Sequence, residues 1–153
     1  MVDKCSSVVG IDLSERNIRK ANNNLKKSPN QKIIFRHNSL NEVLQEHNQH
    51  FDYAILTFVI HEVNEEERIP LLKDIAKVAD KIIIGDYLVP RPNNFTGKLS
   101  RLIEFLAGSE HYRNFRNYVA NGGIPYLADK AGLVIQSEIK NQLTANHITV
   151  LTK

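Results

Sequence analysis

Residues 7–14 read Ser7-Val8-Val9-Gly10-Ile11-Asp12-Leu13-Ser14, a short apolar run followed by an acidic residue and a serine. The apolar run predicts a buried strand, and serine is a residue type favoured at helix N-caps. Beyond it, Ile18, Ala21 and Leu25 recur at helical spacing. The stretch therefore predicts a strand followed directly by a helix, which is the repeating unit of α/β proteins.

The same order of strand and helix repeats along the chain. Strands are predicted over 32–36, 51–60 and 81–86, and helices over 39–45 and from Asn64 onward, where three acids follow the cap. Pro70 in that second helix indicates a kink or the true helix start. Further helices are predicted over about 95–107, 110–120 and 125–131, with a break at Gly122-Gly123.

The last two predicted strands, 133–139 and 147–151, flank a short polar connection, a spacing typical of an antiparallel hairpin. The earlier strands are separated by crossovers long enough for parallel pairing. We therefore expect one α/β domain over residues 1–153, with an open, mostly parallel sheet that ends in an antiparallel hairpin.

Composition narrows the class of protein. The chain has 153 residues, 42% hydrophobic and 24% charged, as in ordinary globular domains. It shows no apolar run of membrane-spanning length and no N-terminal signal region, and its single cysteine cannot form an internal disulfide. These features predict a cytoplasmic protein with no membrane partner.

The charged and metal-ligating residues give weaker signals. The net charge is +3, but the basic residues alternate with polar and apolar positions, so we interpret them as a solvated face and expect no nucleic-acid partner. His61-Glu62 does not begin a zinc-protease motif, because Glu65 stands where the second histidine would be needed. His47 and His50 have no cysteine or acid partner nearby, so we expect no metal.

Five segments carry a resemblance to a known family. They are 9–14 (Val-Gly-Ile-Asp-Leu-Ser), 36–40 (Arg-His-Asn-Ser-Leu), 51–63 with its closing His61, 83–86 (Ile-Ile-Gly-Asp), and 110–133 with Gly122-Gly123 and Ala131-Gly132-Leu133. In this order and spacing they resemble class I S-adenosylmethionine-dependent methyltransferases. The resemblance implies a Rossmann-like sheet that ends in an antiparallel hairpin, covering essentially the whole chain.

The resemblance also implies a site. Asp12 would bind the two ribose hydroxyls of S-adenosylmethionine, since a carboxylate at the end of a strand can accept both protons. The implied cofactor-binding residues are Asp12, Leu13, Asn38, Ser39, Leu40, Thr57 and Phe58. The implied substrate-side candidates are His61, Asp86, Tyr112 and Arg113. The implied function is methyl transfer to a small molecule, and no catalytic residue is assigned, because the sulfonium is already an activated donor.

The chain departs from the family at its amino end. There a first strand and a glycine-rich loop precede the strand that resembles 7–14, and Gly10 lies inside that strand and cannot replace the loop. We therefore expect an N-terminally truncated sheet, exposed strand edges that allow a homodimer, and cofactor binding no tighter than roughly millimolar. Two alternatives stay open. One is a non-catalytic protein that binds no cofactor, and the other is a Rossmann-like domain for a different nucleotide, which the hairpin disfavours.

Overall fold

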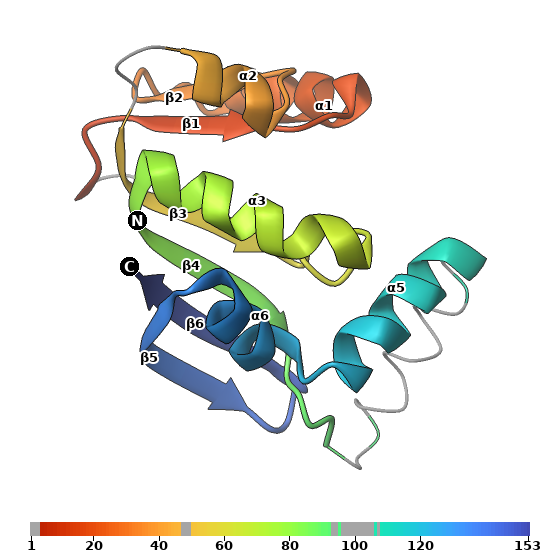
Figure 1. Ribbon diagram of the computed structural model, residues 1–153. Helices are drawn as coiled ribbons and strands as arrows, with labels where there is room; N and C mark the ends of the chain where they lie inside the picture. The colour runs from red at the N-terminus through yellow and green to blue at the C-terminus, as the bar shows by residue number, and fades with distance from the viewer. Residues whose placement is uncertain (1–3, 47–49, 93–94, 96–105, 107) are drawn as a thin grey trace. The chain divides into compact units, whose positions relative to one another are not determined.

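The chain divides into two compact units, unit 1 over residues 1–49 and unit 2 over residues 50–153 (Figure 1). The computed structural model describes residues 4–46, 50–92, 95, 106 and 108–153. The helix predicted over 95–107 lies almost entirely outside the described residues. His47 also lies outside them. Each described strand pairs with strands of its own unit, so each unit has its own sheet.

Unit 1 is a strand–helix–strand–helix unit built on two parallel strands. Its elements are β1 (Val8–Ile11), α1 (Glu15–Lys27), β2 (Ile33–Arg36) and α2 (Leu40–Gln45). Ile11 lies opposite Arg36 in the register, so both strands end at the same edge of the pair. The loops that begin at Asp12 and at His37 therefore start side by side.

Both helices of unit 1 begin at a serine cap, as predicted. The Ser14 hydroxyl accepts a hydrogen bond from the Asn17 backbone N–H at the start of α1. Ser39 and Glu42 form a reciprocal capping box at the start of α2. The backbone N–H of Ser39 donates to the Glu42 carboxylate at 2.6 Å, which lowers the pKa of that side chain.

Unit 2 contains a four-stranded sheet in the order β3-β4-β6-β5. The strands are β3 (Phe51–Thr57), β4 (Ala79–Tyr87), β5 (Val134–Asn141) and β6 (Asn146–Thr152). β3 and β4 are parallel, whereas β6 is antiparallel to both β4 and β5. The antiparallel hairpin predicted at the carboxyl end is thereby confirmed.

One face of this sheet is covered by helices. α3 (Glu65–Val78) contacts β4, and α6 (Gly123–Ala131) contacts β5 and α3; α5 (Ser109–Ala120) contacts α3 and α6. Figure 1 shows α3 and α6 on the same side of the strands. The covered face carries the core, including Ile82, Ile84 and Leu151. Tyr53 and Ile55 on β3 alternate with the buried Leu56 and are each 55% exposed.

Two details differ from expectation. β3 ends at Thr57 and not at Ile60, because Phe58 adopts a positive φ of 52° that leaves the strand conformation. Pro70 lies inside α3, which begins at Glu65, so the proline does not mark the helix start. The described helices include none long and apolar enough to cross a membrane.

Candidate functional site

Asp12 follows β1 and lies at the carboxyl edge of the unit 1 strand pair. One carboxylate oxygen accepts the Ser14 backbone N–H at 2.7 Å, and the other accepts the Asn17 side-chain amide at 3.1 Å. The side chain is half-buried, and its neighbour Leu13 is 76% exposed. The carboxylate is thus fixed by α1's first turn beside an exposed apolar side chain.

The loop after β2 is tied to the loop after β1. His37 Nε2 lies 2.9 Å from the carbonyl oxygen of Leu13, a hydrogen bond between segments 24 residues apart. Asn38 and Leu40 follow, both partly exposed. The Ser39 hydroxyl is occupied by the cap of α2. The structure therefore brings Asp12 and Leu13 next to the 37–40 turn, as parallel pairing requires.

In unit 2, His61 and Asp86 form a buried pair at the carboxyl ends of β3 and β4. His61 Nδ1 lies 2.7 Å from Asp86 Oδ1, and the two residues are 2% and 0% exposed. The same carboxylate accepts the backbone N–H of Tyr87 at 2.7 Å and that of His61 at 3.4 Å. The Asp86 carboxylate thus joins the side chain and backbone of His61 to the backbone of Tyr87.

Aromatic rings surround the His61 imidazole. The ring centroids of Tyr87, Phe115 and Tyr118 lie 4.8, 6.2 and 6.3 Å from it, and that of Phe58 lies 6.4 Å away. Burial, and then the negative charge of Asp86, hold the pKa of Tyr118 well above its usual value. The imidazole is therefore enclosed, and Phe58, 40% exposed, is the most exposed ring of this group.

The loop after β3 is held by a buried arginine. Arg68 on α3 donates to the carbonyl oxygens of Val63, His61 and Asn114 at 2.8, 3.3 and 2.7 Å, and to the Asn117 side chain at 2.9 Å. Burial lowers the pKa of Arg68, although nearby Glu65 opposes that shift. This single side chain connects α3, the loop that contains His61, and α5.

The sequence of the chain also matches a known family. A family profile described as "Methyltransferase domain" matches residues 1–81, more than half of the chain. The chain belongs to the methyltransferase domain family. The matched range contains β1 through β3 and α3, and thus both Asp12 and His61.

Solved structures share the fold of this methyltransferase-family chain. Mitomycin 7-O-methyltransferase MmcR is 10% identical with a TM-score of 0.69, and the alignment covers 96% of this chain and 42% of that one. Magnesium protoporphyrin IX methyltransferase from Synechocystis PCC 6803, with bound SAH, is 17% identical with a TM-score of 0.62, covering 99% and 66%. LepI in complex with SAM is 17% identical with a TM-score of 0.65, covering 98% and 37%.

The structural similarity to these proteins shows the Rossmann-like fold of methyltransferases and no shared activity. The chain spans less than two thirds of the length of each of these three proteins. Among curated proteins no sequence matches the chain.

The other predicted substrate-side residues of this methyltransferase-family chain lie on α5. Phe115 and Tyr118 form the buried face of that helix, whereas the Arg113 side chain is 71% exposed and lies 3.8 Å from Glu110. Tyr112 and Arg113 instead line a shallow open hollow with Ser109, Arg116, Asn117 and Ala120. The structure therefore does not bring Arg113 to the His61–Asp86 pair.

Sequence reasoning did not single out several residues that build these sites. His37 lay inside a quoted segment but was given no role of its own, and Phe115, on the buried face of α5, has a helical spacing that alone would assign it to the core. Arg68 gave no signal, because arginine is seldom fully buried. No group of three histidine, cysteine, aspartate or glutamate side chains in the described part of the chain is arranged to hold a metal ion.

Proposed function

We propose that this chain is an S-adenosylmethionine-dependent methyltransferase that acts on a small-molecule acceptor. The observation that carries the proposal is the Asp12 carboxylate, fixed at the carboxyl edge of a parallel strand pair by Ser14 and Asn17. Ligands of open α/β sheets bind beyond the carboxyl ends of the strands. Membership of the methyltransferase domain family supports the choice of cofactor.

The residues of unit 1 fit the ribose of that cofactor. A carboxylate has about four lone-pair sites, and in Asp12 each oxygen accepts one hydrogen bond from the protein. One acceptor position therefore stays on each oxygen, which suits two adjacent ribose hydroxyls. Leu13, 76% exposed beside the carboxylate, offers an apolar surface. Asn38, Ser39 and Leu40 supply backbone and side-chain contacts for the base from the neighbouring turn.

In unit 2 we assign Thr57 and Phe58 to the cofactor side, with His61 and Asp86 as positioning residues. Phe58 is a non-glycine residue at φ 52°, a strained conformation that often occurs at ligand sites. Its backbone N–H donates to the Gly85 carbonyl at 2.8 Å, and its ring packs edge-on against Tyr87. Since Asp86 holds both Tyr87 and His61, the pair fixes the exposed ring without itself touching a ligand.

Catalysis by such a protein depends mainly on positioning. Bound S-adenosylmethionine supplies an activated methyl group on its sulfonium, so the protein must hold the acceptor in line with it. Tyr112 and Arg113 are proposed for the acceptor side from the resemblance of the α5 segment to small-molecule methyltransferases, and both line the open hollow on α5. Two of the structures with this fold are named for small-molecule methylation, of mitomycin and of magnesium protoporphyrin, and they support that class of acceptor.

A titration with S-adenosylhomocysteine tests the proposal. Each charge-assisted hydrogen bond that a ribose hydroxyl donates to Asp12 is worth about 1.5–3 kcal/mol, against an association cost of at least about 4 kcal/mol. These two bonds alone therefore cannot give binding tighter than roughly millimolar. With contacts from Leu13 and the 37–40 turn added, we expect millimolar dissociation constants, which backbone amide NMR shifts detect. The amides of Leu13 and of 37–40 should shift, and Asp12→Asn, which keeps an acceptor for Ser14, should weaken binding about tenfold.

Glu15→Gln is the matched control, because it removes a neighbouring carboxylate that is not among the proposed cofactor contacts. It should leave the dissociation constant for S-adenosylhomocysteine unchanged. Titrations with ATP and NAD⁺ separate the methyltransferase proposal from a general ribose site. Equal shifts with all three compounds would mean that the site reads ribose alone. No shift at about 10 mM S-adenosylhomocysteine, well above a millimolar dissociation constant, would contradict cofactor binding by this chain.

A further inference from the structure

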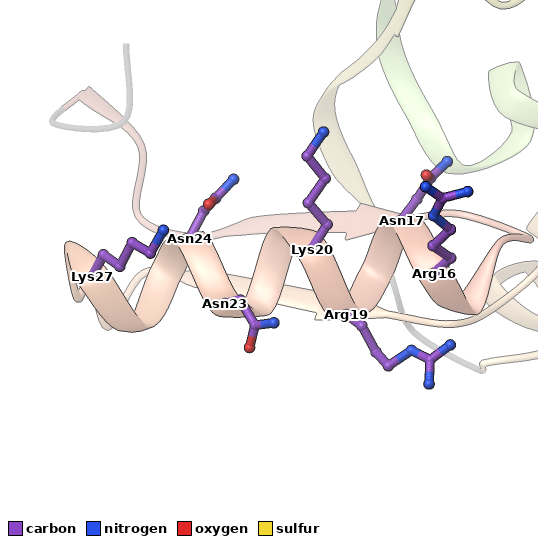
Figure 2. A pocket seen from close by; sticks show the side chains of 7 residues that line it. All are labelled: Arg16, Asn17, Arg19, Lys20, Asn23, Asn24 and Lys27. Atoms are coloured by element: carbon purple, nitrogen blue, oxygen red, sulfur yellow. The ribbon is translucent and has the colours of Figure 1, made fainter.

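The outward side of α1 gathers most of the basic residues of unit 1. Figure 2 shows Arg16, Arg19, Lys20 and Lys27 with the amides of Asn17, Asn23 and Asn24 around one exposed face of the helix. The hollow that these seven residues line lies on this helix alone, so it is an open surface and not an enclosed cavity. Lys26 belongs to the same helix and is also exposed.

Helix geometry explains why the sequence did not reveal this grouping. At about 100° per residue, Arg16, Arg19, Lys20, Lys26 and Lys27 fall within an arc of about 120°, although asparagine, alanine and leucine separate them along the chain. Ile18 points to the other side and is 8% exposed. The five cations, which we name the α1 cation face, extend over about three turns, or about 16 Å.

The charge of this face is not neutralised by the described residues of its unit. The ion pair found in the described residues 4–46 is Arg36–Glu46, and no carboxylate among those residues forms an ion pair with a cation of the face. Residues 1–49 contain eight lysines and arginines against five aspartates and glutamates, whereas residues 50–153 contain twelve of each. The formal charge of +3 therefore arises in unit 1.

We propose that the α1 cation face binds the phosphate backbone of a nucleic acid without reading its sequence. Lysine and arginine contacts to phosphates supply most non-specific affinity for nucleic acid, and asparagine amides commonly donate to phosphate oxygens. This proposal replaces the expectation of a merely solvated face. It does not depend on Asp12 or on methyl transfer.

Other polyanionic partners fit this surface less well. A protein interface normally has an apolar or aromatic centre, and the α1 cation face has neither kind of side chain. A membrane-bound amphipathic helix inserts its apolar side into the lipid, but the apolar Ile18 of α1 is buried in the protein. A linear row of phosphates needs only charge and hydrogen-bond donors, which this face provides.

The salt dependence of binding tests the proposal quantitatively. Binding of the full chain to a fluorescein-labelled single-stranded RNA of about 20 nucleotides is measured by anisotropy between about 50 and 200 mM salt. Five phosphate contacts predict a slope of log K against log salt of about −3.5 for a single strand, and about −4.5 for duplex DNA. The double variant Arg19→Gln/Lys20→Gln should reduce the slope for RNA by about 1.4 and weaken binding about tenfold near 0.15 M salt.

Lys73→Gln/Lys130→Gln is the matched control, because it removes the same charge from exposed positions of α3 and α6 in unit 2. It should leave the slope unchanged, and circular dichroism should show that both double variants are folded. An equal loss of RNA affinity in the two double variants would mean that net charge, and not the α1 cation face, causes binding. That result would overturn the proposal. Binding of phosphatidylserine vesicles that is lost in Arg19→Gln/Lys20→Gln, without RNA binding by the parent chain, would assign the face to lipid and also overturn it.

Discussion

In unit 1 the described residues bury two apolar side chains, Ile18 and Val43, whereas unit 2 buries apolar side chains from β3, β4 and β6 and from α3, α5 and α6. The hydrogen bonds that order unit 1 are mostly short-range, such as the caps at Ser14 and Ser39. Those of unit 2 join residues far apart, as Arg68 does with Asn114 and Asn117. The comparison indicates that unit 1 depends on local backbone order and unit 2 on a shared core.

The two units can be followed separately in one experiment. The chain has no tryptophan, and its five tyrosines all lie in residues 50–153, so tyrosine fluorescence reports unit 2 alone. Amide hydrogen exchange in α1 and α2 reports unit 1. If the comparison holds, exchange should be faster in unit 1, because few buried contacts oppose local opening there.

The largest expected effect comes from Arg68→Met. The substitution keeps an unbranched apolar stem but leaves buried acceptors on Val63, His61 and Asn114 without their donor. Since each buried unsatisfied group costs about 1–3 kcal/mol, the free energy of unfolding of unit 2 should fall by about 3 kcal/mol or more. Urea unfolding followed by tyrosine fluorescence measures this loss.

Arg113→Met is the matched control, because the Arg113 side chain is 71% exposed and should cost no more than about 0.5 kcal/mol. Equal effects of the two substitutions would show that the buried network does not stabilise unit 2.

A smaller effect is expected from Ser14→Ala in unit 1. Loss of the cap should destabilise α1 by about 1 kcal/mol and accelerate exchange of its first-turn amides. Ser28→Ala, at the exposed carboxyl end of the same helix, is the control and should change little. The tyrosine transition should not move with Ser14→Ala. A parallel shift of that transition would break the comparison, because it would show that α1 and unit 2 unfold together.

The smallest expected effect is a change in how the stability of unit 2 depends on pH, caused by a substitution of Glu138 on β5. Burial raises the pKa of Glu138, but hydrogen bonds from His147 at 2.6 Å and from Lys140 outweigh it, so the pKa is lowered in the folded protein. A lowered pKa stabilises the fold above the unfolded value, near 4.5, and this stabilisation is lost as the pH falls through the folded value. Glu138→Gln should therefore make the acid limb of the tyrosine-detected stability curve shallower. Glu110→Gln, on an exposed side chain, should not.

The features that the sequence predicted are those that neighbouring residues determine. The caps at Ser14 and Ser39, the hairpin and the strand that contains Asp86 all follow from patterns within about ten residues, and the structure has them, although β4 runs from Ala79 to Tyr87. Asp12 beside the 37–40 turn was also predictable, because parallel strands end at one edge.

What could not be predicted depends on distant partners. Arg68 looks like an ordinary helix-surface residue until α5, more than 40 residues later, supplies Asn114 and Asn117. The distance between His61 and Asp86 depends on how two strand ends turn, and Phe58 gave no sign in the sequence of a positive φ. The α1 cation face depends on helical angle, which a linear reading of scattered charges does not show.

Asp86 has a consequence for how this protein can change over evolutionary time. One carboxylate accepts hydrogen bonds from His61 and from the backbone of Tyr87, and its charge acts on Tyr118. A substitution there would alter several contacts at once, and no single second substitution could restore them all. Position 86 should therefore be nearly immutable, and new acceptor preferences should arise instead at exposed positions such as Arg113, where a change affects fewer contacts.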